Sequence, residues 1–143
     1  MNAFTASAAA GLGRLFSPRS IAVVGASATL GKIGAVPITL LQRQGFTGAI
    51  YPVNPKAREI QGLRAYPDLA AIDVTVDLVV LAVPAALAVD ALASARPGQV
   101  GAAVVFTSGF AETGEAGVAA QARLMAVARD RGIRVLGPNC LGF

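Results

Sequence analysis

Histidine is absent from this chain of 143 residues, and cysteine occurs only once, at position 140. The chain therefore lacks the side chain that most often serves as a general base and as a metal ligand. A single cysteine excludes an intramolecular disulfide, and with no histidine beside it a zinc site is not expected. We predict no metal site and assign no catalytic residue. The lone thiol fits a reducing, cytoplasmic setting.

Charge is also sparse, because charged residues make up 14% of the chain and hydrophobic residues 55%. Such a composition can fill a core and argues against disorder. The net charge is +4, but the basic residues are scattered and aromatic residues are few. We therefore expect no nucleic-acid partner. The most apolar segment, 76–93, contains Asp77, Pro84 and Asp90, so a membrane span is not expected.

The first 13 residues are small and rich in alanine. They lack the basic start and the long apolar run of a signal peptide. We expect residues 1–13 to be a flexible segment and residues 14–143 to form a single domain.

Apolar runs alternate with helical patterns along the rest of the chain. This alternation predicts an α/β fold with a Rossmann-like, doubly wound parallel sheet of about five strands in a three-layer α/β/α arrangement. Pro37 should lie in the first turn of its helix or kink it. The last helix carries apolar residues at Val118, Ala122, Met125 and Ala126. The predicted strands are 21–25, 49–53, 78–83, 101–107 and 133–136, and the predicted helices are 32–44, 85–95 and 114–130, with a less regular stretch over 59–72 that includes a short helical turn after Pro67.

Ligands bind such sheets beyond the carboxyl ends of the strands. The first loop there contains Gly25, Gly31 and Gly34. A glycine-rich turn between a strand and a helix presents backbone N–H groups to a phosphate. The spacing is wider than in the dinucleotide fingerprint, and a strand-to-helix turn without a ligand remains an alternative. Ser27 and Thr29 add hydroxyl groups suited to a phosphate or to capping a helix.

The second loop reads Tyr51-Pro52-Val53-Asn54-Pro55-Lys56. An NAD site carries a carboxylate at this place for the ribose hydroxyl groups, and this chain has a lysine instead. A lysine favours a ligand with a further phosphate near its ribose, which leaves NADP and coenzyme A (CoA), while a solvated loop lysine is the structural alternative.

The third and fourth predicted strands end in Val83-Pro84 and in Phe106-Thr107-Ser108-Gly109-Phe110. Small and hydroxyl-bearing residues there leave room for a long ligand and can bond its amides, although ordinary turn chemistry also uses them. We interpret Glu112 and Glu115 as charges in the first turn of a helix.

These segments together resemble the N-terminal CoA-binding domain of the NDP-forming (ADP-forming) acyl-CoA synthetases, which are related to the succinyl-CoA synthetase alpha subunit. The resemblance covers about residues 12–143. It is carried by six motifs in the same order, namely Leu15-Phe16-Ser17-Pro18-Arg19-Ser20-Ile21-Ala22-Val23-Val24-Gly25-Ala26-Ser27, Gly31-Lys32-Ile33-Gly34, the Tyr51–Lys56 loop, Val83-Pro84, the Phe106–Phe110 loop, and Gly137-Pro138-Asn139-Cys140-Leu141-Gly142.

The resemblance implies that CoA lies extended across the strand ends. The first loop would meet its phosphates, Lys56 its adenosine end, and Thr107 and Ser108 its pantetheine arm. Asn139 and Cys140 would lie near the reacting thiol, and the role of Cys140 itself is open. The implied ligand-binding residues are Gly25, Ser27, Thr29, Leu30, Gly31, Lys32, Asn54, Lys56, Val83, Pro84, Thr107, Ser108 and Asn139.

In this family, acid, CoA and ATP are converted to acyl-CoA, ADP and phosphate through a phosphorylated histidine. Since the chain has no histidine, we interpret it as an excised domain or a stand-alone CoA binder, inactive alone. Its expected partners are CoA or acyl-CoA and separate phosphohistidine and ATP-grasp domains, and homo-oligomer formation is open. Two alternatives remain, an NADP- or NAD-binding domain of an oxidoreductase or redox sensor, and a regulatory CoA-binding domain fused to a protein acetyltransferase.

Overall fold

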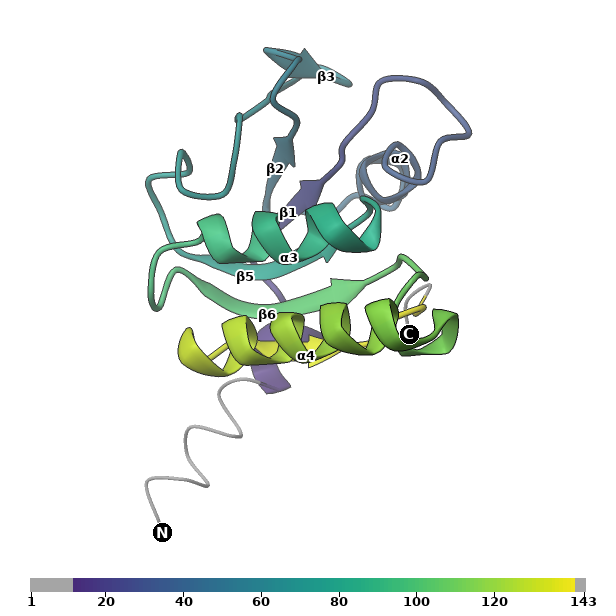
Figure 1. Ribbon diagram of the computed structural model, residues 1–143. Helices are drawn as coiled ribbons and strands as arrows, with labels where there is room; N and C mark the ends of the chain where they lie inside the picture. The colour runs from purple at the N-terminus through teal and green to yellow at the C-terminus, as the bar shows by residue number, and fades with distance from the viewer. Residues whose placement is uncertain (1–11, 141–143) are drawn as a thin grey trace, which may run out of the picture.

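A parallel sheet of short apolar strands forms the middle layer of the computed structural model, which describes residues 12–140 (Figure 1). Its elements in chain order are β1 (Ser20–Val24), α2 (Val36–Arg43), β2 (Ala49–Val53), β3 (Glu59–Ile60), β4 (Leu63–Arg64), β5 (Val76–Leu81), α3 (Ala85–Ser94), β6 (Val100–Val105), η1 (Ala111–Thr113, a 3₁₀ turn), α4 (Glu115–Asp130) and β7 (Arg134–Leu136).

The sheet has the strand order β2-β1-β5-β6-β7, and every pairing in it is parallel. The chain moves outward from β1 to β2 and then returns past β1 to continue in the opposite direction. The order therefore reverses between β1 and β5, and ligands of such sheets bind at that switch point. The predicted fold, a doubly wound parallel sheet of five strands, is confirmed.

Two apolar cores lie on the two faces of the sheet. In β1, Ala22 and Val24 face one core, and Ile21 and Val23 face the other. The first core is closed by α3 and α4, which lie side by side in Figure 1, and the second by α2. Because the central strands are largely buried on both faces, their sequences are mostly apolar instead of alternating.

The helix predicted over 32–44 begins later, at Val36. Residues 32–35 form a bend and turns instead of helix, and Gly34 packs so closely on the Gly25 carbonyl oxygen that a Cβ there would lie 1.8 Å from it. Pro37 occupies the first turn, one of the two predicted outcomes, where its missing N–H has no helical partner to lose. Residues 26–35 thus form a longer loop than the sequence suggested.

The stretch 59–72 contains a two-stranded antiparallel hairpin, β3 and β4, that the sequence did not reveal. After Pro67, the expected helical turn is a single turn closed by the Ile72 N–H and the Leu69 carbonyl, 3.1 Å apart. Two strands of two residues each are too short to show an alternating pattern.

Helix α4 faces the sheet with Gly117, Ala120, Leu124 and Ala128. A Cβ atom on Gly117 would lie 1.8 Å from the Phe110 carbonyl oxygen, so only glycine allows the helix to approach this closely. The apolar residues noted in the sequence, Val118, Ala122, Met125 and Ala126, are exposed on the other side.

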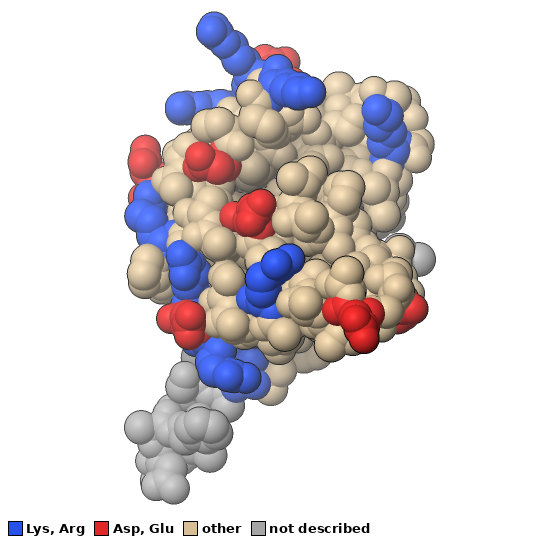
Figure 2. Space-filling view, in the orientation of Figure 1, with Lys and Arg blue, Asp and Glu red and all other residues tan. Residues whose placement is uncertain are grey.

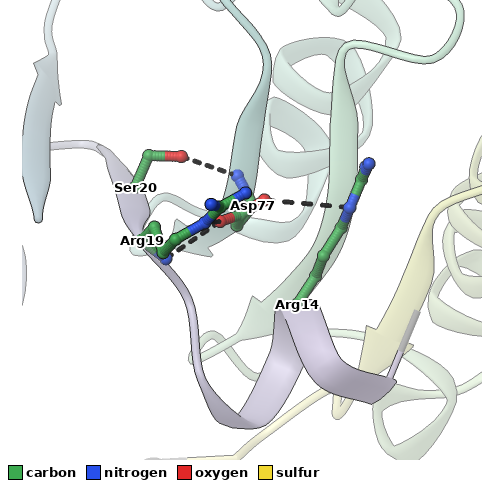
Figure 3. A network of polar contacts seen from close by, with 4 residues as sticks. All are labelled: Arg14, Arg19, Ser20 and Asp77. Carbon is green, nitrogen blue, oxygen red and sulfur yellow. Dashed lines mark hydrogen bonds and ion pairs between the residues drawn. The ribbon is translucent and has the colours of Figure 1, made fainter. Parts of the chain in front are cut away.

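At the amino end of the sheet, Asp77 connects three segments (Figure 3). Its Oδ2 accepts a hydrogen bond from the Arg19 backbone N–H at 2.9 Å, and its Oδ1 lies 3.7 Å from Arg14 Nε. Its own N–H donates to Ser20 Oγ at 2.9 Å. Helical residues 12–16, β1 and β5 are thereby joined at the edge opposite the carboxyl ends of the strands. Residues 1–11 of the predicted flexible segment lie outside the described residues.

Candidate functional site: a cavity at the carboxyl edge of the sheet

A cavity of about 500 Å³ opens where the carboxyl ends of β1, β2 and β5 meet α3. Its volume is in the range of small-molecule sites. Most of the lining is apolar, with a few polar side chains at its border. The residues that line it are Val24, Gly25, Val53, Asn54, Pro55, Lys56, Pro67, Asp68, Leu69, Val83, Leu87, Asp90, Ala91 and Ser94.

Two glycines allow the backbone to pack closely at the base of this cavity. A Cβ on Gly25, which has φ +82°, would lie 2.6 Å from the Ala82 carbonyl oxygen. A Cβ on Gly34 would lie 1.8 Å from the Gly25 carbonyl oxygen. The first loop therefore folds back onto the end of β1, and β1 lies directly against the end of β5. A Cβ on Gly31 would have no atom within 4 Å, so glycine is required at that position for its positive φ alone.

The side chains of the first loop act within the loop. Ser27 Oγ accepts a hydrogen bond from the Thr29 N–H at 3.0 Å. Neither residue caps α2, because that helix begins after Ala35 and has no side-chain cap. Leu30 is 75% exposed, and Lys32 is exposed with no salt bridge among the described residues. The loop thus presents its backbone and one lysine to the solvent.

Asn54 joins the second loop to the first. Its Nδ2 donates to the Ala26 carbonyl at 2.9 Å, and its Oδ1 accepts from the Lys56 N–H at 2.8 Å. The second bond closes an Asx turn, a motif in which Asn hydrogen-bonds the backbone two residues on. Asn54 therefore places Lys56 at the border of the cavity and fixes the backbone of the first loop.

The ends of β6 and β7 form a second part of the edge. The Asn139 N–H donates to the Thr107 carbonyl at 3.0 Å. The Thr107 hydroxyl is buried and has no hydrogen-bond partner among the described residues. A buried hydroxyl without a partner loses its hydration without compensation, so a ligand group at this place would satisfy it. Residues Leu141 and Gly142 of the last motif lie outside the described residues.

Glu112 holds the loop that follows Thr107. Its Oε1 accepts hydrogen bonds from the backbone N–H groups of Gly109 and Phe110. The bond from Gly109 is the main cause that lowers the pKa of Glu112 below its usual value. Glu112 lies in the 3₁₀ turn before α4, whereas Glu115 is the first residue of α4. Glu115 thus occupies the first turn of α4 and Glu112 that of the 3₁₀ helix, as interpreted from the sequence, and Glu112 also holds the preceding loop.

Of the predicted ligand residues, the structure brings Gly25, Asn54, Lys56 and Val83 into the lining of one cavity. Pro84 precedes α3 as its N-cap residue. Leu30 and Gly31 lie over α2, where they line a separate shallow hollow. Ser27, Thr29, Lys32, Thr107, Ser108 and Asn139 line neither this cavity nor the hollow over α2.

Sequence reasoning missed the face of α3 that closes the cavity. Leu87, Asp90, Ala91 and Ser94 follow the three- and four-residue spacing of one helix face. Asp90 has no salt bridge or hydrogen bond from its side chain among the described residues. The sequence did carry a signal for this face, because Asp90 and Ser94 place a charge and a hydroxyl on one side of an otherwise apolar helix.

Charges of both signs are interspersed on the face of the molecule shown in Figure 2, which has no continuous basic surface. Within residues 12–140, no helix has the length and apolar character needed to cross a membrane.

The fold and its edge define an α/β domain with a doubly wound parallel sheet and a cavity at the switch point. Residues 19–143 match the family described as "CoA binding domain", and the chain belongs to that family. This result confirms the resemblance drawn from the six motifs.

Curated relatives agree with this assignment. The chain is 42% identical over 128 residues to "Acetate--CoA ligase [ADP-forming] II" of Archaeoglobus fulgidus, covering 90% of this chain and 19% of that protein. It is 41% identical over 129 residues to a "Trans-feruloyl-CoA synthase" of an unknown prokaryotic organism, covering 90% of this chain and 18% of that protein. The chain thus spans about a fifth of the length of these relatives.

A solved structure shows the same arrangement. The ligand-free "dinucleotide forming Acetyl-coenzyme A synthetase 1" of Ca. Korarchaeum cryptofilum superimposes with a TM-score of 0.82 at 42% identity. The match covers 90% of this chain and 28% of that chain.

Proposed function

We propose that this chain binds CoA along the carboxyl edge of its sheet and is the CoA-binding unit of an ADP-forming acyl-CoA synthetase. The observation that carries the proposal is the placement of Lys56. It borders an apolar cavity at the end of β2, where an NAD site has a carboxylate, in a chain that belongs to the CoA-binding family.

The geometry supports one direction for the ligand. The adenosine end would occupy the cavity between β2 and α3, with the 3′-phosphate at Lys56. The pyrophosphate would contact the backbone N–H groups of the first loop, since turns between a strand and a helix commonly bind phosphates in this way. The pantetheine arm would then run toward Thr107 and Ser108, where the buried Thr107 hydroxyl lacks a partner among the described residues. Its thiol would end near Asn139.

The activity of the whole protein belongs to the same proposal. In it, acid, CoA and ATP would give acyl-CoA, ADP and phosphate, and the phosphorylated histidine and the ATP site would come from other domains. The two relatives named above carry acetate and feruloyl in their names, yet this chain is similar to each to nearly the same degree. The acyl group would therefore be selected mainly outside this domain. The cytoplasmic location stays a prediction from the single cysteine.

The test is calorimetric titration of the 143-residue chain with CoA, dephospho-CoA and NADPH. We expect CoA to bind, and dephospho-CoA to bind more weakly because it lacks the 3′-phosphate. Lys56→Ala should lower the affinity for CoA and leave that for dephospho-CoA nearly unchanged. Arg123→Ala is the control. It also removes one positive charge, but from an exposed residue on α4 that does not line the cavity.

Binding of NADPH without binding of CoA would replace this proposal with an oxidoreductase domain. Equal affinity for CoA and dephospho-CoA would contradict the role of Lys56 and leave CoA as the ligand.

A further inference from the structure

Gln61 occupies the tip of the β3–β4 hairpin with φ +52°, followed by Gly62 with φ +78°. Two consecutive residues with positive φ between paired strands form a type I′ turn. The first position of that turn favours Asn, Asp or Gly, because other residues pay a steric cost in the left-handed region. Glutamine is unusual at this position, which suggests that its side chain has a role of its own.

That side chain crosses from the hairpin to the first loop and to α2. Its Nε2 donates to the Ser27 carbonyl at 3.2 Å and to the Ala35 carbonyl at 3.1 Å. Its Oε1 lies 2.9 Å from the Thr39 hydroxyl, which can donate to it. Two carbonyl neighbours require the NH₂ group on their side, so the orientation of the amide is determined by its contacts.

The backbone of Gln61 is held as well, since its carbonyl accepts a hydrogen bond from Gln42 Nε2 at 3.1 Å. Both ends of the bridge are therefore fixed. The hairpin is attached to α2, and the side-chain amide connects the first turn of α2 to the first loop.

The bond to Ser27 determines the direction of the next backbone amide. In a trans peptide the C=O of one residue and the N–H of the next point in opposite directions. With the Ser27 carbonyl directed at Gln61, the Ala28 N–H points away from the protein. Ala28 is exposed, and its N–H has no hydrogen-bond partner among residues 12–140.

We propose that Gln61 is a positioning residue that orients the Ala28 amide toward a phosphate of the ligand. This inference rests on the proposed binding of CoA. The longer glutamine would serve at the tip of the turn because asparagine, which the turn favours, is one methylene shorter and would not reach the Ser27 carbonyl.

The experiment uses Gln61→Asn and Gln61→Gly in the 143-residue chain, because both residues suit a type I′ turn and remove the bridge. CoA and pantetheine are titrated by calorimetry and by NMR, and unfolding by urea is measured in parallel. We expect both variants to fold and to bind CoA about tenfold more weakly, the loss that corresponds to one hydrogen bond to a charged group. Affinity for pantetheine, which has no phosphate, should not change.

The NMR signal of the Ala28 amide adds a readout that a purely structural role would not affect. It should move strongly on addition of CoA to the wild type and weakly in either variant. Gln61→Glu should also bind weakly, because its carboxylate keeps the acceptor for Thr39 but faces two carbonyl oxygens.

Equal losses for CoA and pantetheine, or unchanged affinity for CoA with an intact Ala28 response, would overturn the role of Gln61 and leave the proposed function standing. Failure of the wild type to bind CoA would overturn both.

Discussion

The side-chain amide of Asn54 donates a 2.9 Å hydrogen bond to the carbonyl oxygen of Ala26, 28 residues earlier in the chain. The neighbouring carbonyl, that of Ser27, accepts from Gln61 Nε2 at 3.2 Å. Two side chains from different elements thus hold consecutive carbonyls of the first loop. The loop is ordered before any ligand binds, and less entropy is lost on binding a phosphate there.

Replacing Asn54 should therefore weaken CoA binding. Asn54→Ala removes the bonds to Ala26 and to the Lys56 N–H, and we expect a loss of about 1–2 kcal/mol of stability and roughly tenfold in affinity. Asn54→Asp keeps the acceptor for the Lys56 N–H but loses the donor to Ala26 and adds a negative charge, so it should lower the affinity for CoA at least as much. Calorimetry with CoA and urea unfolding measure the two quantities.

Gln44→Ala is the control for Asn54, because that exposed side-chain amide has no hydrogen-bond partner among the described residues. Unchanged affinity in both Asn54 variants would show that the order of the loop does not matter for binding.

Thr107 allows stability and binding to be separated. Its hydroxyl is buried without a partner among the described residues, so Thr107→Val removes an unsatisfied group while keeping the shape of the side chain. We expect the free energy of unfolding of the ligand-free protein to stay the same or rise by up to about 1 kcal/mol. Affinity for CoA should fall about five- to tenfold, since the ligand loses the hydroxyl. Urea unfolding and calorimetry measure the two effects.

The matched control is Thr113→Val. Unlike Thr107, the Thr113 hydroxyl donates a hydrogen bond to the Phe110 carbonyl at 2.8 Å. That variant should lose about 1 kcal/mol of stability and keep its affinity. If Thr107→Val behaved in the same way, its hydroxyl would be satisfied within the protein and would have no role in binding.

Gly34 and Gly31 lie in the same loop but should respond differently to alanine. A Cβ on Gly34 would lie 1.8 Å from the Gly25 carbonyl oxygen, so the backbone would have to move. We expect Gly34→Ala to cost about 2–4 kcal/mol in urea unfolding and to abolish the close packing at the cavity. In Gly31→Ala the new Cβ has no atom within 4 Å, so only the positive φ of +88° is unfavourable. We expect that to lower the free energy of unfolding by about 1–2 kcal/mol. Gly34 does not have a positive φ, so a cost for Gly34→Ala no larger than that for Gly31→Ala would mean that the loop accommodates the Cβ and that the close approach does not require glycine.

The parts of the structure that could be predicted from the sequence are those set by local patterns. Apolar runs predicted the five strands, most clearly the central strands β1, β5 and β6, which are largely buried on both faces and therefore mostly apolar. The position of Lys56 followed from its place at the end of the second strand. Bounds were less accurate at the start of α2, where residues 32–35 belong to the loop and Pro37 lies in the first helical turn.

The remaining features depend on contacts between distant residues. Gln61 meets Ser27 across 34 positions of the chain, and no local pattern encodes that pairing. The hairpin that carries Gln61 has strands of two residues, too short to detect. The unsatisfied Thr107 hydroxyl became visible only when its surroundings were known. Sequence patterns therefore located the edge proposed to bind the ligand, whereas the arrangement within the edge required the structure.

Glu112 makes the loop after β6 sensitive to acid. The Gly109 N–H, followed by the other backbone donors, holds the pKa of Glu112 below its usual 4.5. A carboxyl group with a lowered pKa stabilises the fold above its ordinary pKa, and the contribution is lost as the pH falls through the lowered value. Wild type should therefore be more stable than Glu112→Gln near neutral pH, and the difference should shrink as the pH falls below about 4.

Urea unfolding of both proteins between about pH 6 and about pH 3 measures this difference. Glu115→Gln is the control, because the Glu115 side chain has no hydrogen bond or ion pair among the described residues. The NMR signals of the Gly109 and Phe110 amides should titrate with the Glu112 carboxyl in the wild type and stay constant in Glu112→Gln. A stability difference that grew toward acid pH would mean that the protonated carboxyl, and not the carboxylate, holds the loop, contrary to the hydrogen bonds that Glu112 accepts.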